Sequence, residues 1–498
     1  MKTSIDPINV SSQLAGKRVL ITGTTGFLGK VLLEKLARDV PEIKKFVLLI
    51  RANKIYSTAA ERFEHEILAS SVFDRLREER SQYLADMVRD KFDYVTGEVT
   101  EPLFGLTSSG FAQLAKDIDI VVNSAASVNF REELDQALEI NALSLLQMTK
   151  LVSLAGDIPL IHISTCYVNG YNKGQMHEQL VEPSSKLIPF HADDYYEVRP
   201  LIADLRLKID AIKRSGLTGA GLSRALTDLG IREANHYGWN DTYTFTKWIG
   251  EQIACRELQG KSLTILRPAI IESSLCEPKP GWLEGIKVAD AVIMAYARGR
   301  TKFFPATPGE FIDVIPADLV ANSIILSMAE ALAHPKQRRI YQCSSSSSNP
   351  IKLGELIDIL RTACYLNWRS YDRLFHRQPD KNFRCVSRPV FLVTMHVLKL
   401  TLGTISWIRK CLGMNPSFAR LKSFHTTHEL SVVFSFYTSP SYTFLNTKLL
   451  ALEARMDEHD RRLFPVDARK IDWAEYLGRI HLEGLNRFVL KDRPRSPP

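Results

Sequence analysis

The stretch KRVLITGTTGFLGK, Lys17–Lys30, decides the fold because it joins a strand, a glycine-rich turn and the start of a helix. Residues 18–22 form an apolar run typical of a strand buried on both faces. Three glycines follow in a GxxGxxG spacing, and helical apolar periodicity then continues to residue 37. Such a turn lets the backbone approach a pyrophosphate at the positive end of the helix dipole, although it can also be purely structural. The candidate cofactor-binding residues of this stretch are Gly23, Thr25, Gly26, Phe27, Leu28 and Gly29.

Length, composition and charge limit the class of protein. The 498 residues exceed one compact domain, and 45% hydrophobic with 24% charged residues is ordinary for a globular enzyme. A net charge of +8 favours anionic partners, such as a phosphorylated cofactor, a CoA-like substrate or an anionic membrane surface, although it also serves solubility. We find no basic block interleaved with aromatic residues, so we expect no nucleic-acid partner.

The cysteines and the N-terminus indicate the cellular setting. Seven cysteines, an odd number with no CxxC pair, predict neither a disulfide framework nor a zinc site, and we expect no metal. The first residues, MKTSIDPINVSSQ, lack the apolar segment of a secretory signal. The sequence therefore predicts a cytoplasmic protein.

The second predicted strand, residues 46–50, ends at a residue that bears on cofactor choice. Sites selective for NAD usually have Asp or Glu here to hold the ribose 2′-hydroxyl. This chain has Arg51, with Lys54 close behind. A guanidinium can form a bidentate pair with a 2′-phosphate, whereas a carboxylate would repel it. We therefore expect NADPH as the cofactor, the alternative being that Arg51 only ends a strand in solvent.

Further strands follow at the spacing of an α/β sheet. Residues 55–90 are predicted to be a helical insertion, and residues 139–156 to be an amphipathic helix that contains Asn141. Strands are predicted at 92–96, 118–123 and 159–164. The fold class is therefore α/β, with a Rossmann-type doubly wound parallel sheet. The residues expected near the cofactor after these strands are Glu98, Val99, Ala125 and Ala126. The two alanines could equally serve helix–strand packing.

A tyrosine and a lysine provide the candidate acid–base chemistry. Tyr243 and Lys247 are four residues apart, so on a helix they project from the same face. Of the sixteen tyrosines, only Tyr243 has a lysine at the fourth following position. A nearby ammonium and a nicotinamide cation would lower the tyrosine pKa from about 10. A Ser or Thr hydroxyl at the end of the strand 159–164 would complete the site by binding the substrate oxygen.

Taken together, these motifs resemble the extended short-chain dehydrogenase/reductase superfamily. Within it the chain is similar to the alcohol-forming fatty acyl-CoA reductases, and among these to the bacterial ones. The resemblance extends from about residue 17 to residue 488. Its motifs are VLLIR at 47–51, NSAASVNF at 123–130, STCYVNG at 164–170, YTFTK at 243–247, RPAI at 267–270, EPKPGW at 277–282, DVIPAD at 313–318, FPVD at 464–467 and IDW at 471–473.

The resemblance implies roles for individual residues. Tyr243 would be the proton donor, Lys247 would lower its pKa and bind the nicotinamide ribose, and Thr165 would be the active-site hydroxyl. Thr165 is preferred to Ser164 because neighbouring strand residues face opposite ways. Positions implied to contact or support the cofactor are Asn141, Pro268 and Ile270. Glu98 stands where Asp is more usual in the family, and the resemblance implies that it contacts the adenine end.

Two regions fall outside the nucleotide-binding pattern. Residues 172–240 are too long for a βα loop and predict an acyl- or CoA-binding cap, or else a surface insertion, with a helix over 205–234. Residues 390–408 are mostly apolar but interrupted by charge, which argues against a spanning helix. They predict an amphipathic helix at a membrane surface or over the active site, or a buried helix. We expect a reductase domain at 1–370 and a helical C-terminal domain at 371–498.

The reaction implied is reduction of long-chain fatty acyl-CoA by NADPH to an aldehyde, with release of CoA, and then to a fatty alcohol, as in wax ester and other lipid metabolism. An acyl-carrier protein could replace CoA. A covalent intermediate at Cys166 is a lesser possibility, since its side chain should point away from Thr165. Alternatives are an aldehyde-forming reductase, a nucleotide-sugar epimerase or dehydratase, and a non-catalytic NADP sensor or membrane scaffold.

Overall fold

The computed structural model describes residues 7–297, 303–381, 383–411, 436–437 and 441–490. The chain divides into two compact units. The first comprises Met1–Leu283, Asp313–Asn349 and Tyr442–Ile471, and the second comprises Glu284–Ile312, Pro350–Ser441 and Asp472–Pro498. This division differs from a single boundary at residue 370, because 284–312 packs in the second unit and 442–471 packs in the first.

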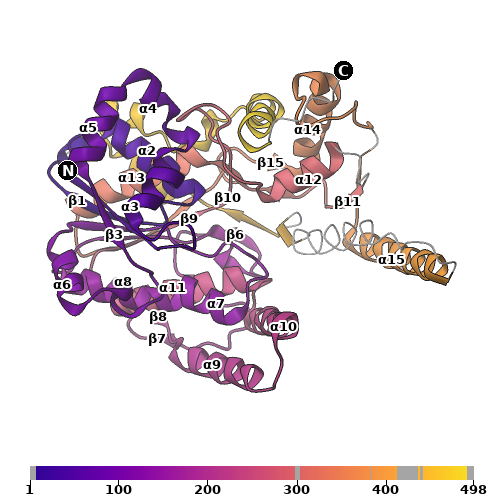
Figure 1. Cartoon of the computed structure of the whole chain (residues 1–498), viewed down its shortest axis with the longest axis horizontal. Coiled ribbons are helices and arrows are strands. Elements are labelled where there is room, and N and C mark those ends of the chain that lie inside the picture. The colour runs from indigo at the N-terminus through magenta and orange to yellow at the C-terminus, as the bar shows by residue number, and fades with distance from the viewer. Residues whose placement is uncertain (1–6, 298–302, 382, 412–435, 438–440, 491–498) are drawn as a thin grey trace. The chain divides into compact units, whose positions relative to one another are not determined.

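A seven-stranded parallel sheet forms the centre of the first unit (Figure 1). From one edge to the other, the strands are β14 (Arg338–Cys343), β9 (Leu263–Pro268), β5 (Leu160–Ile163), β4 (Ile120–Asn123), β1 (Arg18–Thr22), β2 (Lys45–Ile50) and β3 (Phe92–Thr96). Val19 lies opposite Phe46 in β2 and Ile120 in β4, so β1 is paired on both sides. Successive connections run outward from β1 in opposite directions, which confirms the predicted doubly wound sheet and sets a switch point between β1 and β4.

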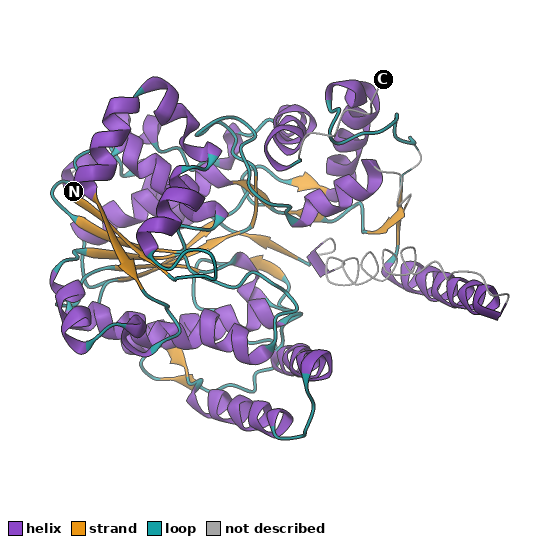
Figure 2. Cartoon of the chain, in the orientation of Figure 1, coloured by secondary structure: helices purple, strands orange, loops and turns teal. Residues whose placement is uncertain are grey.

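Helices cover both faces of this sheet (Figures 1 and 2). One face carries α2 (Phe27–Asp39) and α13 (Ala317–Ala333), which pack against each other, with α1 (Val10–Leu14) against α13. The other face carries α6 (Ser108–Lys116), α8 (Ser144–Leu154) and α11 (Thr242–Glu257). Strands β1, β2, β4 and β5 are buried along almost their whole length, which is why they read as nearly continuous apolar runs rather than alternating ones. The edge strand β3 is buried only at Phe92.

Two segments of the first unit differ in detail from the sequence-based expectation. The single helix expected over 139–156 is a π-helical turn, η4 (Glu139–Leu143), followed by α8, and the helical segment already begins at α7 (Leu134–Leu138). The helix expected over 205–234 is two helices, α9 (Arg199–Lys213) and α10 (Gly219–Tyr237). A turn with Gly216 and Gly219 at positive φ separates them, a conformation that glycine adopts without steric cost.

The first unit contains further short elements around the sheet. They are α3 (Ala59–Arg62), η1 (Phe63–Leu68), η2 (Ser71–Phe73), α4 (Asp74–Glu79), α5 (Ser81–Lys91), η3 (Pro102–Gly105), η5 (Cys166–Asn169), β6 (Gly174–Met176), β7 (Phe190–His191), β8 (Tyr195–Tyr196), β10 (Ile270–Glu272), β13 (Val314–Pro316), β17 (Tyr442–Phe444), α17 (Thr447–Ala454), α18 (Glu458–Leu463) and η7 (Ala468–Lys470). The helices α3 to α5 form the insertion expected at 55–90.

The second unit is mainly helical. Its elements are α12 (Val288–Ala297), β11 (Phe303–Pro305), β12 (Phe311–Ile312), β15 (Ile351–Lys352), α14 (Leu353–Asn367), η6 (Trp368–Ser370), β16 (Arg384–Val386), α15 (Arg388–Cys411), α19 (Trp473–Glu475), η8 (Tyr476–His481), α20 (Leu482–Gly484) and η9 (Leu485–Val489). Among the described residues, no helix combines the length and hydropathy that crossing a bilayer requires.

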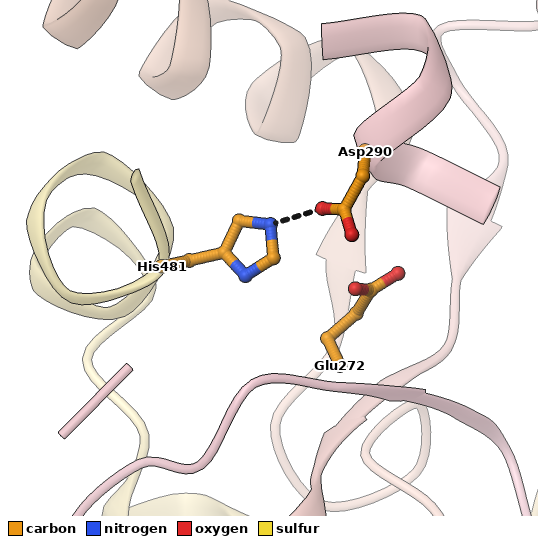
Figure 3. A group of neighbouring side chains, drawn as sticks. All are labelled: Glu272, Asp290 and His481. Atoms are coloured by element: carbon orange, nitrogen blue, oxygen red, sulfur yellow. Dashed lines mark hydrogen bonds and ion pairs between the residues drawn. The ribbon is translucent and has the colours of Figure 1, made fainter. Parts of the chain in front are cut away.

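Buried polar contacts join the C-terminal helices of the second unit to its earlier segments. His481 Nε2 lies 3.0 Å from Asp290 Oδ1, and both side chains are buried (Figure 3). The other oxygen of Asp290 accepts the backbone N–H of Lys287 at 2.7 Å. The Tyr371 hydroxyl donates to the carbonyl of Gly478 at 3.3 Å. These bonds satisfy groups that would otherwise be costly to bury, and they fix η8 against α12 and the turn after α14.

Candidate active site

The site is built at the carboxyl ends of the central strands, where β1 and β4 diverge. Gly23 directly follows β1 and has a φ of +75°, and a Cβ there would lie 2.6 Å from the carbonyl carbon of Ser124. Only glycine permits this approach, which brings the turn before α2 against the backbone at the end of β4. Thr22 joins the end of β1 to the end of β4. Its hydroxyl donates to Asn123 Oδ1 at 2.8 Å and accepts the Ala125 N–H at 3.1 Å. The glycine turn and Ala125 are thus brought together.

The residues expected at the adenosine end lie on the next strands. Arg51 follows β2 and Glu98 follows β3, and their side chains form an ion pair of 3.4 Å. The Arg51 side chain is 62% exposed, so the pair is largely solvated. The Arg51 carbonyl accepts a hydrogen bond from Arg62 at 2.9 Å, which fixes its backbone. Val99 is buried, so its side chain belongs to the core.

Tyr243 and Lys247 lie on the first turns of α11, whose start is well defined. Asp241 caps this helix, because its Oδ1 accepts the Thr244 N–H at 2.8 Å and the Thr244 hydroxyl at 3.0 Å. Lys247 is 1% exposed, and its ammonium donates to the carbonyl of Ile163, the last residue of β5, at 2.6 Å. That bond ties α11 to the strand that leads directly to Thr165.

Burial dominates the electrostatics of both groups. It lowers the pKa of Lys247 to about 8, while the Glu251 carboxylate acts to raise it. Burial likewise raises the pKa of Tyr243 above its ordinary value, the Asp241 carboxylate adds to the rise, and a hydrogen bond with Thr165 opposes it. Tyr243 is therefore a protonated phenol at neutral pH in the protein without cofactor. The lowering of its pKa by Lys247, which the resemblance implies, stays a prediction.

Thr165 lies at the end of β5, directly before η5. Its hydroxyl accepts the Tyr167 N–H at 3.2 Å and lies 3.4 Å from the carbonyl of Pro268, at the end of the adjacent strand β9. The Thr165 hydroxyl is also hydrogen-bonded to the Tyr243 phenol, so the two groups lie side by side. Ile270, two residues beyond Pro268, donates its N–H to the Asp313 carbonyl at 3.2 Å. The structure thus brings Thr165, Tyr243, Lys247 and Pro268 together.

Asn141 supports this point from the π-helical turn η4. Its side-chain oxygen accepts the Ser127 N–H at 2.9 Å, and its amide donates to the Ser127 carbonyl and the Thr246 hydroxyl, each at 3.1 Å. α11 approaches this turn so closely that a Cβ on Gly250 would lie 2.3 Å from the Asn141 carbonyl oxygen. Asn141 therefore joins the loop after β4 to the helix that carries Tyr243 and Lys247.

Sequence reasoning gave no role to two features of the site. The Phe130 ring meets the Tyr243 ring edge to face, with centroids 5.6 Å apart and an interplanar angle of 89°. Arg267 and Glu251 form a fully buried bidentate pair, with N–O distances of 2.9 and 2.6 Å. The only signals in the sequence were the closing Phe of NSAASVNF and the Arg of RPAI.

Cys166 and Trp282 both have well-defined surroundings in the structure. Cys166 is fully buried and donates to the Arg267 carbonyl at 2.9 Å, and burial raises its thiol pKa well above the ordinary value. Such a thiol is a poor nucleophile, which disfavours an acyl-cysteine intermediate. Trp282 stacks on Phe27 at 5.5 Å and donates to the Ser71 hydroxyl at 3.0 Å. Trp282 therefore packs behind the start of α2.

The residues present fit a nicotinamide dinucleotide. A glycine turn leads into α2 at the switch point of the sheet, and the helix cap, Gly26, carries no side chain that would compete for its N–H groups. The Ser124 and Ala125 backbone lies beside this turn, while Lys247 and Tyr243 lie at the end of β5. These positions span the expected path from pyrophosphate to nicotinamide.

The sequence matches two family models. Both are described as male sterility protein; the first is an NAD-binding model that matches residues 21–324, and the second matches residues 397–492. "Fatty acyl-CoA reductase 2, chloroplastic" of Arabidopsis thaliana is 31% identical over 98% of this chain and 80% of its own length. The chain belongs to the fatty acyl-CoA reductase family. It is an oxidoreductase with a nicotinamide-binding domain, and the resemblance seen in its motifs is confirmed.

Other members of the fatty acyl-CoA reductase family align over nearly the whole chain. "Alcohol-forming fatty acyl-CoA reductase" of Simmondsia chinensis is 30% identical over 96% of this chain and 98% of its own length. "Fatty acyl-CoA reductase 1" of Rattus norvegicus is 27% identical over 99% and 88%, respectively. The terminal reductase domain of the myxalamid biosynthetic pathway shares the fold, with a TM-score of 0.58 and 17% identity over 95% of this chain and 90% of that domain.

Proposed function

We propose that this chain reduces long-chain fatty acyl-CoA to the fatty alcohol through an aldehyde, with NADPH as the reductant and CoA as the first product. The observation that carries the proposal is the convergence of the Thr165 hydroxyl, the Tyr243 phenol and the Lys247 ammonium beside a dinucleotide-binding turn. This convergence occurs in a chain that aligns over nearly its whole length with fatty acyl-CoA reductases, one of which is named as alcohol-forming.

Tyr243 and Thr165 are suited to handle the charge that develops on the substrate oxygen. A bound reduced nicotinamide supplies the hydride for each of the two reductions. In the first, the thioester carbonyl becomes an oxyanion, which the Tyr243 and Thr165 hydroxyls stabilise by donating hydrogen bonds. Collapse of this adduct breaks the C–S bond, releases CoA and leaves the aldehyde. In the second, Tyr243 gives its proton to the aldehyde oxygen, which produces the alcohol.

Lys247 is suited to orient the cofactor and to restore the proton on Tyr243. An ammonium has three N–H donors, and Ile163 accepts one of them. The others can reach ribose hydroxyls beside the nicotinamide. No step requires a covalent acyl-enzyme, which agrees with the buried, protonated thiol of Cys166.

The preference for NADPH rests on Arg51. Its exposed guanidinium at the end of β2 is available to a 2′-phosphate, and Glu98 then loses its ion pair with Arg51 or shares Arg51 with the phosphate.

Two further parts of the proposal concern the acyl carrier and the cellular location. Acyl-carrier protein is an alternative donor of the acyl group, and we propose a cytoplasmic enzyme in peripheral contact with a membrane.

The test is the stoichiometry of the purified protein with a long-chain acyl-CoA. We expect two NADPH oxidised for each CoA released, and fatty alcohol identified as the product by mass spectrometry. One NADPH per CoA, with aldehyde accumulating, would replace the proposal with an aldehyde-forming reductase. No oxidation of either NADPH or NADH would overturn it and favour an action on nucleotide-sugars. Repeating the assay with acyl-carrier protein as the donor tests the alternative acyl carrier.

A further inference from the structure

Helix α15 exposes an apolar surface that the chemistry of the active site does not explain. The exposed side chains lie at intervals of three and four residues, so they form one stripe along the helix. They are Val390, Val393, Val397 and Leu400, each more than half exposed, and we call them the α15 stripe. Phe391 and Met395 are buried on another side of the helix. One side of α15 therefore packs against the protein, while the side that carries the α15 stripe faces solvent.

The hydroxyl groups beside the α15 stripe are hydrogen-bonded to the helix itself. Thr394 donates to the Val390 carbonyl at 2.8 Å, Thr401 to the Val397 carbonyl at 3.1 Å, and Thr404 to the Leu400 carbonyl at 2.9 Å. In water these bonds gain little, because an exposed hydroxyl can bond to solvent. In an apolar phase each hydroxyl must find a partner within the protein. This side of α15 can therefore leave water without an unsatisfied hydroxyl.

The sequence around the α15 stripe carries charge of one sign only. From residue 381 to residue 428 the chain contains no Asp or Glu. The same stretch contains eight basic residues: Lys381, Arg384, Arg388, Lys399, Arg409, Lys410, Arg420 and Lys422. Apolar residues with cations on the same segment are typical of helices that lie in the headgroup region of anionic membranes.

We propose that the α15 stripe docks on an anionic lipid bilayer, with α15 lying along the interface. The inference rests on the proposed function, because fatty acyl substrates and fatty alcohol products both partition into bilayers. It goes further by naming the surface that binds and the lipid charge that it requires. A second copy of this chain is a less suitable occupant, since symmetric pairing would bring two all-cationic segments together.

The test is co-sedimentation of the full chain with vesicles. We expect binding to vesicles that contain about one-third phosphatidylglycerol, and at least about tenfold weaker binding to pure phosphatidylcholine. The double variant Val393→Glu/Leu400→Glu should lower binding to the anionic vesicles by about tenfold or more. Leu366→Glu is the matched control, because Leu366 is a 68% exposed leucine of the same unit on α14. It should bind like the unmodified protein.

Two further measurements keep the outcomes distinct. The thermal unfolding midpoint shows whether the double variant folds, and reduction of a water-soluble short-chain acyl-CoA tests the proposed function without a membrane. Vesicle binding without any reductase activity would support docking and count against the proposed function. Equal vesicle binding by the double variant and the unmodified protein would overturn the docking proposal. So would a dimer that the double variant abolishes, in a protein that does not bind anionic vesicles.

Discussion

Lys247 and Arg51 both bring a positive charge to the carboxyl edge of the same sheet, yet their surroundings are opposite. Lys247 is 1% exposed, and burial lowers its pKa to about 8. The Arg51 side chain is 62% exposed and pairs with Glu98 at 3.4 Å in contact with solvent. Charges in a low-dielectric interior interact strongly, whereas exposed pairs are screened and contribute little to stability. The catalytic end should therefore respond steeply to substitution, and the adenosine end gradually and in a salt-dependent way.

The largest effect that we predict lies at the catalytic end. Tyr243→Phe removes the proton donor and should lower kcat by about a thousandfold, within the range for loss of a general acid. The Phe side chain keeps the edge-to-face contact with Phe130, so the thermal unfolding midpoint should change little. Steady-state kinetics and calorimetry check these two results.

The matched control for that substitution is Tyr237→Phe. Tyr237, the last residue of α10, is also partly buried. Its ring stacks on that of Phe245 in α11, the helix that carries Tyr243, with ring centroids 5.7 Å apart. It should keep nearly full activity. Comparable loss of kcat in both variants would mean that the effect comes from packing of α11, and the role of Tyr243 as proton donor would then be wrong.

The adenosine end should show a smaller effect, confined to one cofactor. Arg51→Glu replaces a phosphate-binding cation by a repelling carboxylate, so KM for NADPH should rise by about 30- to 100-fold. KM for NADH should stay the same or fall. The rise should shrink at high salt, because the site is exposed. Arg89→Glu is the control, since Arg89 is 66% exposed and pairs with Asp86 and Asp90. An unchanged KM for NADPH in Arg51→Glu would remove the basis for preferring NADPH.

Local sequence patterns predict the elements that carry the site, but they do not predict the contacts between residues that are distant in the sequence. Local patterns predict strand β1, the glycine turn and a helix that carries Tyr243 and Lys247, and the structure confirms these three elements. The contact of Phe130 with Tyr243 and the burial of Arg267 with Glu251 join residues more than a dozen positions apart, and no period encodes them. The π-helical turn at Asn141 was missed because its sequence is compatible with a continuous helix. The interleaving of the two units depends on the path of residues 284–312 and 442–471, which local propensity does not fix.

A pH prediction follows from the buried lysine. Because the folded pKa of Lys247 is about 8, its ammonium deprotonates above that pH, and kcat/KM should fall toward tenfold per pH unit. The unfolded state keeps its proton up to about pH 10.4, so it binds more protons than the folded state between the two values. The free energy of unfolding should therefore gain a rising contribution over this range, at most about 1.4 kcal/mol per pH unit.

Urea unfolding at pH 7 and pH 9 checks the sign of this contribution. The comparison uses Lys247→Met, which has no proton to release and should lack the rise. If the free energies of unfolding of the two proteins differ by the same amount at pH 7 and pH 9, Lys247 keeps an ordinary pKa. The contrast between the buried Lys247 and the exposed Arg51 would then lose its electrostatic basis.

The smallest effect concerns Phe130, which tests whether the catalytic end depends on packing as well as on charge. Its ring meets that of Tyr243 at 89°, a geometry worth about 0.5–1.5 kcal/mol beyond burial. Phe130→Leu keeps the apolar volume but removes the aromatic edge, so Tyr243 should lose orientation and kcat should fall by about three- to tenfold. KM for the cofactor should not change, because Phe130 lies at the nicotinamide end. Restoration of kcat by Phe130→Tyr would support an orienting role, since the ring returns. If the Phe130→Leu and Phe130→Tyr variants both keep full kcat, the Phe130 ring does not orient Tyr243. The Tyr243 phenol is then held only by its hydrogen bond with Thr165 and by its position on α11.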